Sequence, residues 1–261
     1  MKQERAQTLE FIRVEKAGPV RTITMTRGHK RNALTIAMLA EMEEALMEPA
    51  TPDERVIVLR AEGPAFCAGM DLKERLERPI TNDESPIEAT LHALENHPLP
   101  AVAVVQGDAI AGGCELALHC DFVVSDEKAR FGMSLAQIGL APTWFLAKKL
   151  MEVAGPVGAR EVLLLGDPLQ ASRLKDMGVI HSTASKDGLE AAASAVIDRL
   201  AKNAPLSLRA IKALLVREMA FRDGVYHGDV DKLINATRTS YDGKEGIRAR
   251  LEKRNPVFKG E

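Results

Sequence analysis

The feature of this sequence that most constrains its fold is a pattern that occurs twice: a short apolar run, a loop containing glycine, and then a helix. The first copy has the apolar run 56–59, a loop over 62–69 and a polar helix that begins near Asp71. The second has the run 101–105 and a helix that begins near Gly112. Short continuous runs of β-branched and small apolar residues are typical of strands buried on both faces. The pattern therefore predicts an α/β fold.

The flanking segments extend this plan. Alternating runs over 9–14 and 20–25 predict a β-hairpin, and apolar residues at helical spacing after Thr35 predict a helix with Thr35 as its N-cap. A third short strand is expected at 122–124, and the charged stretch 79–86 is expected to be mobile. After Pro142 the sequence reads as almost wholly helical, with helices expected at 144–153, 159–165, 189–201, 205–219 and 244–253.

Composition excludes several classes of protein. The chain has 261 residues, enough for one large domain, and its 35 Lys and Arg nearly balance its 37 Asp and Glu, which argues against a general nucleic-acid binder. Aromatic residues make up 4%, too few for stacking bases or sugars. The charge is uneven, since residues 198–261 carry +5 and residues 1–197 carry −7. The basic end is either a solvated surface or one that binds an anionic ligand or a neighbouring subunit.

The cysteines and the first residues of the chain indicate the cellular compartment in which the protein is expected. Cys67, Cys114 and Cys120 form no CxxC pair, which fits small buried residues in a reducing compartment and argues against a structural metal site. The start of the chain is polar, and no apolar run reaches the length of a membrane span. We expect a soluble cytoplasmic protein with no membrane or nucleic-acid partner.

Each glycine loop precedes a helix, and this places free backbone N–H groups at two points. Helix N-termini hold negatively charged oxygens, so two of them facing one point would form an oxyanion hole. Tight turns also need glycine whatever the function. Glu115 favours the functional interpretation because a carboxylate in an otherwise apolar helix is costly unless it is hydrogen-bonded or protonated. A general acid/base is one reason for such a residue.

At these residues the sequence resembles the enoyl-CoA hydratase/isomerase family, the crotonases. The segment 66–74 is similar to the family's first oxyanion-hole segment, and 100–121 is similar to its central motif. Residues 31–34, 131–132, 253–254 and 258–259 also fall where the family pattern has them. The resemblance implies a spiral of repeated ββα units over 1–197 and a C-terminal helical trimerisation region over 198–261. It also implies a homotrimer, usually paired into a homohexamer.

The resemblance also implies the residues of an acyl-CoA site. The backbone N–H groups of Met70 and Gly112 would hold the thioester oxygen, and Glu115 would be the acid/base. No metal or separate cofactor is expected, because CoA enters as part of the substrate. Cations and an aromatic ring near the ends of the chain would approach the adenine and phosphates of CoA, at Arg27, Lys30, Arg31, Phe258 and Lys259. Other substrate contacts are expected at Ala33, Ala68, Asp71, Leu72, Leu135, Thr143 and Trp144.

One departure from the family pattern affects the expected reaction. Hydratases of the family pair two glutamates, and Leu135 stands where the second is expected. Leucine transfers no proton. Glu115 alone would therefore have to take the proton from the attacking water and pass it to the α-carbon. Enoyl-CoA hydratase is the favoured activity. The alternatives are another crotonase reaction (isomerase, decarboxylase or thioester hydrolase) or an acyl-CoA-binding homologue with weak turnover.

Three further side chains have open interpretations. Thr143 either bonds a water or polar acyl group, as Gln137 could, or caps a helix. Trp144 either lines the acyl pocket or belongs to the core. His119, four residues after Glu115, either pairs with it on one helix face or is simply packed.

Overall fold

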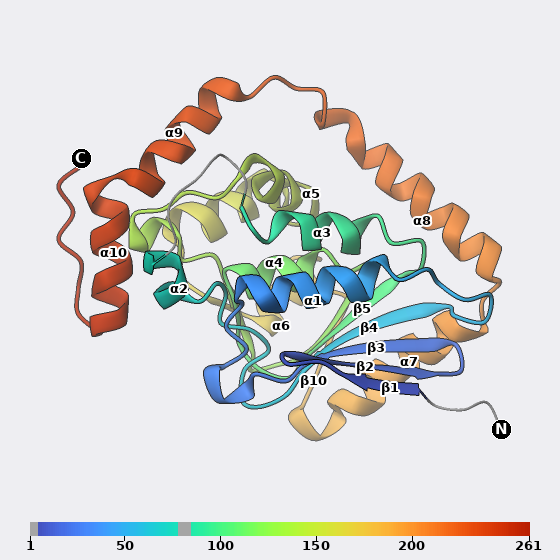
Figure 1. Ribbon diagram of the computed structural model, residues 1–261. Helices are drawn as coiled ribbons and strands as arrows, with labels where there is room; N and C mark the ends of the chain where they lie inside the picture. The colour runs from blue at the N-terminus through green and yellow to red at the C-terminus, as the bar shows by residue number, and fades with distance from the viewer. Residues whose placement is uncertain (1–4, 78–84) are drawn as a thin grey trace.

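The computed structural model describes residues 5–77 and 85–261, and its centre is a seven-stranded sheet (Figure 1). The strand order is β1-β2-β3-β4-β5-β7-β10. The pairs β1–β2 and β2–β3 are antiparallel, and the pairs from β3 to β10 are parallel. The strands are β1 (Arg5–Thr8), β2 (Ile12–Ala17), β3 (Val20–Met25), β4 (Val56–Ala61), β5 (Ala101–Val105), β7 (Phe122–Asp126) and β10 (Ser182–Ala184).

A smaller sheet holds the second glycine loop. It consists of β6 (Ala109–Ile110), β8 (Arg130–Gly132) and β9 (Leu169–Gln170), in the order β6-β8-β9. The strand β6 leads directly into α4, so the small sheet fixes where that helix begins.

Helices cover both faces of the large sheet (Figure 1). The helices are α1 (Ile36–Met47), α2 (Leu72–Glu77), α3 (Glu88–Glu95), α4 (Gly112–Leu118), α5 (Trp144–Arg160), α6 (Ala171–Asp176), α7 (Leu189–Lys202), α8 (Pro205–Met219), α9 (Gly228–Thr239) and α10 (Tyr241–Glu252).

The two faces of the central strands explain their continuous apolar sequences. On β4 and β5, Ile57, Leu59 and Ala103 join the main core with α1, α3 and α4. The alternate residues, such as Val58 and Val102, pack on the other face against α7. Successive side chains of a strand point to opposite faces, so a strand covered on both sides is apolar throughout. The prediction that these strands are buried on both faces is confirmed.

The last helices leave the core and return to it. Figure 1 shows α8 and α9 as an arch, and α10 comes back beside α2. A Cβ on Gly246 of α10 would lie 2.3 Å from the carbonyl oxygen of Ile138, so α10 packs tightly on the 3-10 turn at Ala136–Ile138. Large apolar side chains of the arch face solvent, among them Leu206, Ile211, Leu214, Leu215, Phe221 and Leu233.

Most predicted elements are present, with differences after Pro142. The hairpin is β2 and β3, the helix after Thr35 is α1, and the helix expected over 205–219 is α8. The part after Pro142 is mostly helical, as expected, but the short strands β9 and β10 and the helices α6 and α9 were not predicted. Helix α5 continues to Arg160 through a break at Gly155, which has φ 63°. The stretch expected to be mobile, 79–86, falls mostly on residues 78–84, outside the described residues. No helix in the described ranges is both long enough and apolar enough to cross a bilayer.

Candidate active site

Two glycine loops from different parts of the chain meet beside α4. The loop after β4 runs alongside β6, where Ile110 N–H donates to the Cys67 carbonyl at 2.9 Å. A Cβ on Gly69 would lie 2.9 Å from the Ile110 carbonyl oxygen and 3.3 Å from the Gly112 nitrogen. Only glycine permits this approach, and Gly69 also has a positive φ of 86°. The two loops that the sequence repeat singles out are therefore in direct contact.

Two backbone donors lie at this junction. Gly112 opens α4, so its N–H has no partner within the helix. Among the described residues, neither the Met70 nor the Gly112 N–H donates to a protein acceptor. The preceding Ala111 has φ 48° and ψ −119°, a strained conformation of the kind found at functional sites. The arrangement can hold a developing negative charge on an oxygen.

Glu115 lies one turn into α4 and is buried, with 8% of its surface exposed. Burial, together with the negative charge of Glu88, raises the pKa of Glu115 to about 8. The carboxyl is therefore protonated at neutral pH and can donate a proton. A raised carboxyl pKa in a cavity is typical of a general acid.

Glu115 and both donors line one cavity of about 150 Å³. Of the predicted substrate contacts, four line the same cavity: Ala68, Leu72, Leu135 and Thr143. Leu135 is thus in the wall facing the reaction site. The Thr143 side chain caps α5 by accepting from Leu146 N–H at 3.4 Å, which confirms the capping interpretation, and its bond to a water or acyl group stays a prediction. Apolar lining surrounds these few polar groups, as in enzyme pockets generally.

The residues expected near CoA lie outside this cavity. Lys30 and Arg31 are exposed in the turn after β3. Arg27 is half-buried and donates to Ala33 O at 2.7 Å and to Asp71 Oδ2 at 2.9 Å, so it holds two loops together.

The C-terminal residues and the tryptophan also lie outside it. Phe258 is half exposed, and the Lys259 ammonium lies 4.1 Å from the ring centre of Tyr241 on α10. Trp144 lines a neighbouring hollow instead, where its ring stacks on His227 with centroids 4.6 Å apart. The roles of these residues toward CoA and the acyl group stay predictions.

Four charged residues of the cavity wall were missed by sequence reasoning. Arg75, Arg238 and Arg250 come from α2, α9 and α10, and Glu88 comes from the first turn of α3. The three arginines are far apart in the sequence, so no local pattern marks them. Glu88 and Leu91 are three residues apart and share a helix face, but nothing local shows that this face meets α4.

His119 and the cysteines are packed groups. His119 Nδ1 donates to the backbone carbonyl of Glu115 at 2.7 Å and not to its carboxyl, and burial lowers the pKa of His119 to about 4. Burial raises the pKa of the Cys67 and Cys114 thiols to about 12, and Cys120 is shifted in the same direction. The interpretation of the cysteines as small buried residues is confirmed.

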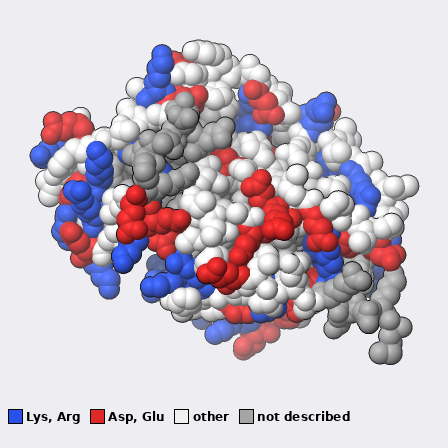
Figure 2. Space-filling model, viewed as in Figure 1, with Lys and Arg blue, Asp and Glu red and all other residues white. Residues whose placement is uncertain are grey.

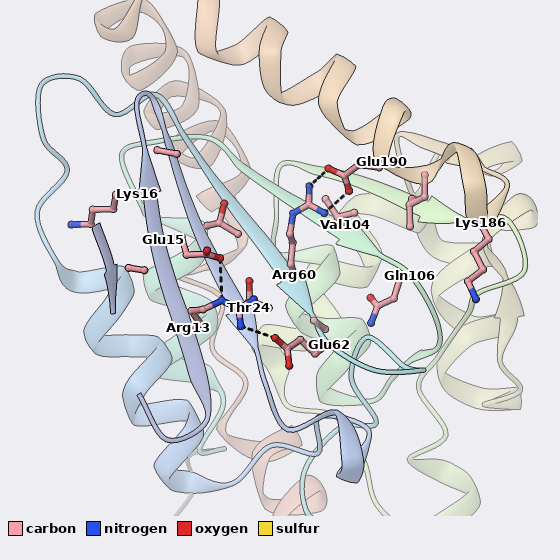
Figure 3. Close-up of a pocket in the computed structure, with 15 residues that line it drawn as sticks. Arg13, Glu15, Lys16, Thr24, Arg60, Glu62, Val104, Gln106, Lys186 and Glu190 are labelled. Carbon is pink, nitrogen blue, oxygen red and sulfur yellow. Dashed lines mark hydrogen bonds and ion pairs between the residues drawn. The ribbon is translucent and has the colours of Figure 1, made fainter. Parts of the chain in front are cut away.

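A second hollow, of about 660 Å³, lies on the large sheet near the start of α7 (Figure 3). Two ion pairs lie in it: Arg13 pairs with Glu62 at 2.6 Å, and Arg60 pairs with Glu190 at 2.8 Å. None of the predicted site residues lines it. The cavity at α4 is therefore the candidate reaction site.

The surface charge follows the division seen in the sequence. Figure 2 shows Lys and Arg gathered over α10 at the edge of the molecule, near the cavity wall that Arg250 helps to form. Exposed basic residues of this region are Lys244, Arg248, Arg250, Lys253 and Arg254. Within the described ranges, no three His, Cys, Asp or Glu side chains gather as a metal-binding group.

Comparison with known proteins shows the family to which the chain belongs. The profile of the Enoyl-CoA hydratase/isomerase family matches residues 15–261. The chain is 36% identical over 258 residues to a Thermus thermophilus protein provisionally named an enoyl-CoA hydratase, covering 95% of this chain and 100% of that one. It is 32% identical over 254 residues to 2,3-dehydroadipyl-CoA hydratase of Escherichia coli, covering 95% and 98%.

Solved structures share the fold. An enoyl-CoA hydratase from Mycobacterium avium subsp. paratuberculosis superposes with a TM-score of 0.84 at 25% identity, covering 97% of this chain and 100% of that one. A methylmalonyl-CoA decarboxylase superposes with a TM-score of 0.88 at 24% identity, covering 98% and 100%, which shows the fold alone. The chain therefore belongs to the enoyl-CoA hydratase/isomerase family, the crotonases, and is an acyl-CoA enzyme of that family.

Proposed function

We propose that the protein is an enoyl-CoA hydratase that adds water to a 2-enoyl-CoA through an enolate. The observation that carries the proposal is the buried Glu115 carboxyl, which lines the same cavity as Met70 and Gly112 and whose pKa is raised by burial. The two N–H groups would stabilise the enolate oxygen, each worth about 3–4 kcal/mol where such a donor has been removed by mutation. Glu115 would give its proton to the α-carbon. The hydratase names of the two relatives support this reaction.

Double-bond isomerisation is the second candidate, although isomerases of the family commonly keep a carboxylate on the segment that here carries Leu135. Moving a proton from one carbon to another needs a single carboxyl group, whereas adding water needs a base for the water as well as an acid for the carbon. Leu135 removes the family's usual second carboxyl from the wall of the cavity. Decarboxylation, thioester hydrolysis and binding with weak turnover are the remaining alternatives.

A product screen in heavy-oxygen water separates these reactions. The protein is incubated with short, branched and aromatic acyl-CoAs, and the products are analysed by mass spectrometry. Hydration places the label on the β-carbon, hydrolysis places it in a free acid, and isomerisation gives a rearranged ester without label. Decarboxylation is seen as loss of carbon dioxide. Label on the β-carbon is the expected result, and its absence with every enoyl-CoA would rule out the proposed reaction.

The proposal extends to the CoA-binding residues, the oligomeric state and the cofactor requirement. Lys30, Arg31, Phe258 and Lys259 are assigned to the CoA nucleotide, because exposed cations suit its phosphates. The region 198–261 is assigned to assembly of a homotrimer or homohexamer, supported by the exposed apolar side chains of α8 and α9. The protein is proposed to need no metal or separate cofactor.

A further inference from the structure

We propose that Glu88 is the second carboxylate of the reaction site and acts as the general base that activates water. It would replace, from a different helix, the glutamate that the family pattern places at position 135. This inference deepens the proposed hydratase function and rests on it.

The start of α3 lies beside the start of α4, and this places Glu88 at the cavity. Ile87, which is 2% exposed, reaches the start of α4, and its Cδ1 lies 3.0 Å from where a Cβ on Gly112 would be. The next residue, Glu88, lines the cavity together with Leu91 one turn later. Glu115 lines it from α4. The contact between Ile87 and Gly112 thus brings two carboxyl groups to one cavity from two helices.

One oxygen of the Glu88 carboxyl accepts no hydrogen bond from the described residues. This oxygen, Oε1, is shielded from solvent. Buried polar atoms are almost always hydrogen-bonded, so an exception calls for an explanation. A general base needs such an oxygen, because it must accept the proton of the attacking water.

The two carboxyl groups have different surroundings. Burial, together with the negative charge of Glu88, raises the pKa of Glu115 to about 8. Glu88 lies in the first turn of α3, where the helix dipole favours an anion. Neighbouring carboxyls whose environments separate them in this way can act as an acid and a base.

The reaction step balances with these two groups. Glu88 takes a proton from water while the water oxygen bonds to the β-carbon of the enoyl thioester. The π electrons move to the α-carbon and onto the thioester oxygen, which the Met70 and Gly112 N–H groups hold. The α-carbon then takes the proton of Glu115, which becomes a carboxylate. Transfer of a proton from Glu88 back to Glu115, directly or through solvent, restores both groups.

Charged groups from several other elements line the two hollows that Glu88 borders. The reaction cavity also holds the arginines of α2, α9 and α10. Glu88 also borders the hollow that Trp144 and His227 line. The charged groups of that hollow pair with one another: Lys148 with Asp223, and His227 with Asp231. The remaining titratable side chain of that hollow is His92, on the same helix.

The test compares Glu88→Gln, Glu88→Asp and a matched control, Glu95→Gln. Glu95 is the other carboxylate of α3 and pairs with Lys149. With an enoyl-CoA that the wild type hydrates, we expect kcat of Glu88→Gln to fall by about 10²–10⁴-fold with little change in KM. Glu88→Asp should keep part of the activity, and Glu95→Gln nearly all of it. Glu88→Gln should also lose the acidic limb of the pH–rate profile, which a merely structural change would not remove.

A double variant tests whether the activity lost in Glu88→Gln is lost because a carboxyl group has been removed from the cavity. Adding Leu135→Glu to Glu88→Gln should restore at least about tenfold in kcat, because it returns a base to the opposite wall. Thermal unfolding of each variant shows that the fold is kept.

The contrary results are distinct. If the wild type hydrates an enoyl-CoA and Glu88→Gln keeps its kcat, or loses kcat with an unchanged pH profile, Glu88 is not the base and the hydratase function stands. If the wild type hydrates no enoyl-CoA, the hydratase function fails, and this role for Glu88 fails with it.

Discussion

The Arg27 guanidinium donates to Asp71 Oδ2 at 2.9 Å and ties the turn after β3 to the loop that carries Met70. Both side chains are mostly buried, with 16% and 19% exposed. Burial alone would raise the pKa of Asp71, but the hydrogen bond and charge of Arg27 lower it below its usual value. The loop that carries Met70, the proposed oxyanion donor, is therefore held in place by an ion pair of the next residue in the sequence.

Breaking this pair should weaken both stability and turnover. We expect Arg27→Gln and Asp71→Asn each to lower the free energy of unfolding by about 1.5–3 kcal/mol, the range for a hydrogen bond to a charged group. The double variant should cost less than the two single changes added together. Denaturant unfolding and kcat are measured for the four proteins, with Arg13→Gln, in an exposed ion pair, as the control. Additive effects would show that the pair is not coupled.

Removing the acid should stop the reaction but not binding. Glu115→Gln has nearly the same shape and cannot release a proton at neutral pH, so we expect kcat to fall by about 10²–10⁴-fold. Affinity for a saturated acyl-CoA, measured by calorimetry, should be unchanged. Glu44→Gln, an exposed position on α1, is the control. Unchanged turnover in Glu115→Gln would remove Glu115 from the mechanism.

The raised pKa of Glu115 also predicts how stability changes with pH. The unfolded chain ionises this carboxyl near pH 4.5, whereas the folded protein holds the proton to about pH 8. Folded protein therefore binds more protons between these values, and its stability falls as the pH rises through this window. Each pKa unit corresponds to about 1.4 kcal/mol. The difference in unfolding temperature between Glu115→Gln and the wild type should therefore shift in favour of the variant as the pH rises from 5 to 9. Parallel curves would contradict the raised pKa.

Alanine substitutions at the glycines test the packing of the loops. A Cβ on Gly113 would lie 2.3 Å from the Cys67 carbonyl oxygen, which is backbone and cannot move aside. We expect Gly113→Ala to cost at least about 1–3 kcal/mol of unfolding free energy, as overpacking does. Gly112→Ala meets only the flexible ends of Ile87 and Leu34, so it should fold. Gly224→Ala, with nothing within 4 Å, is the control. Equal stability of all three would contradict the close approach.

The exposed apolar face of α8 predicts an assembly. Leu214 is 57% exposed and lies beside Leu215 and Ile211 in the arch. We expect the wild type to sediment as a trimer or hexamer and Leu214→Asp to shift it toward smaller species. Met47→Asp, an equally exposed apolar position on α1, should leave the assembly unchanged. A monomeric wild type at micromolar concentration would rule out this use of the face.

The sequence by itself determined the elements whose signals are local. Continuous apolar runs predicted β4 and β5 because both faces of those strands are covered, and Pro205 with helical spacing predicted α8. The two glycine loops and Glu115 could be identified from the sequence. Each glycine loop precedes a helix, where free N–H groups can hold an anion, and a carboxyl in an apolar helix is costly unless it is hydrogen-bonded or protonated.

Only the tertiary structure decided which distant residues share the site. Strand β10 has no apolar run of its own and exists because it pairs with β7. Glu88 looks like any acidic residue at a helix start until Ile87 packs against Gly112 and turns that helix toward Glu115. Spacing along the chain predicts contacts within an element, whereas contacts between elements depend on packing that no local pattern records. The sequence therefore determined the loops and the acid, and the fold decided which carboxylate stands beside them.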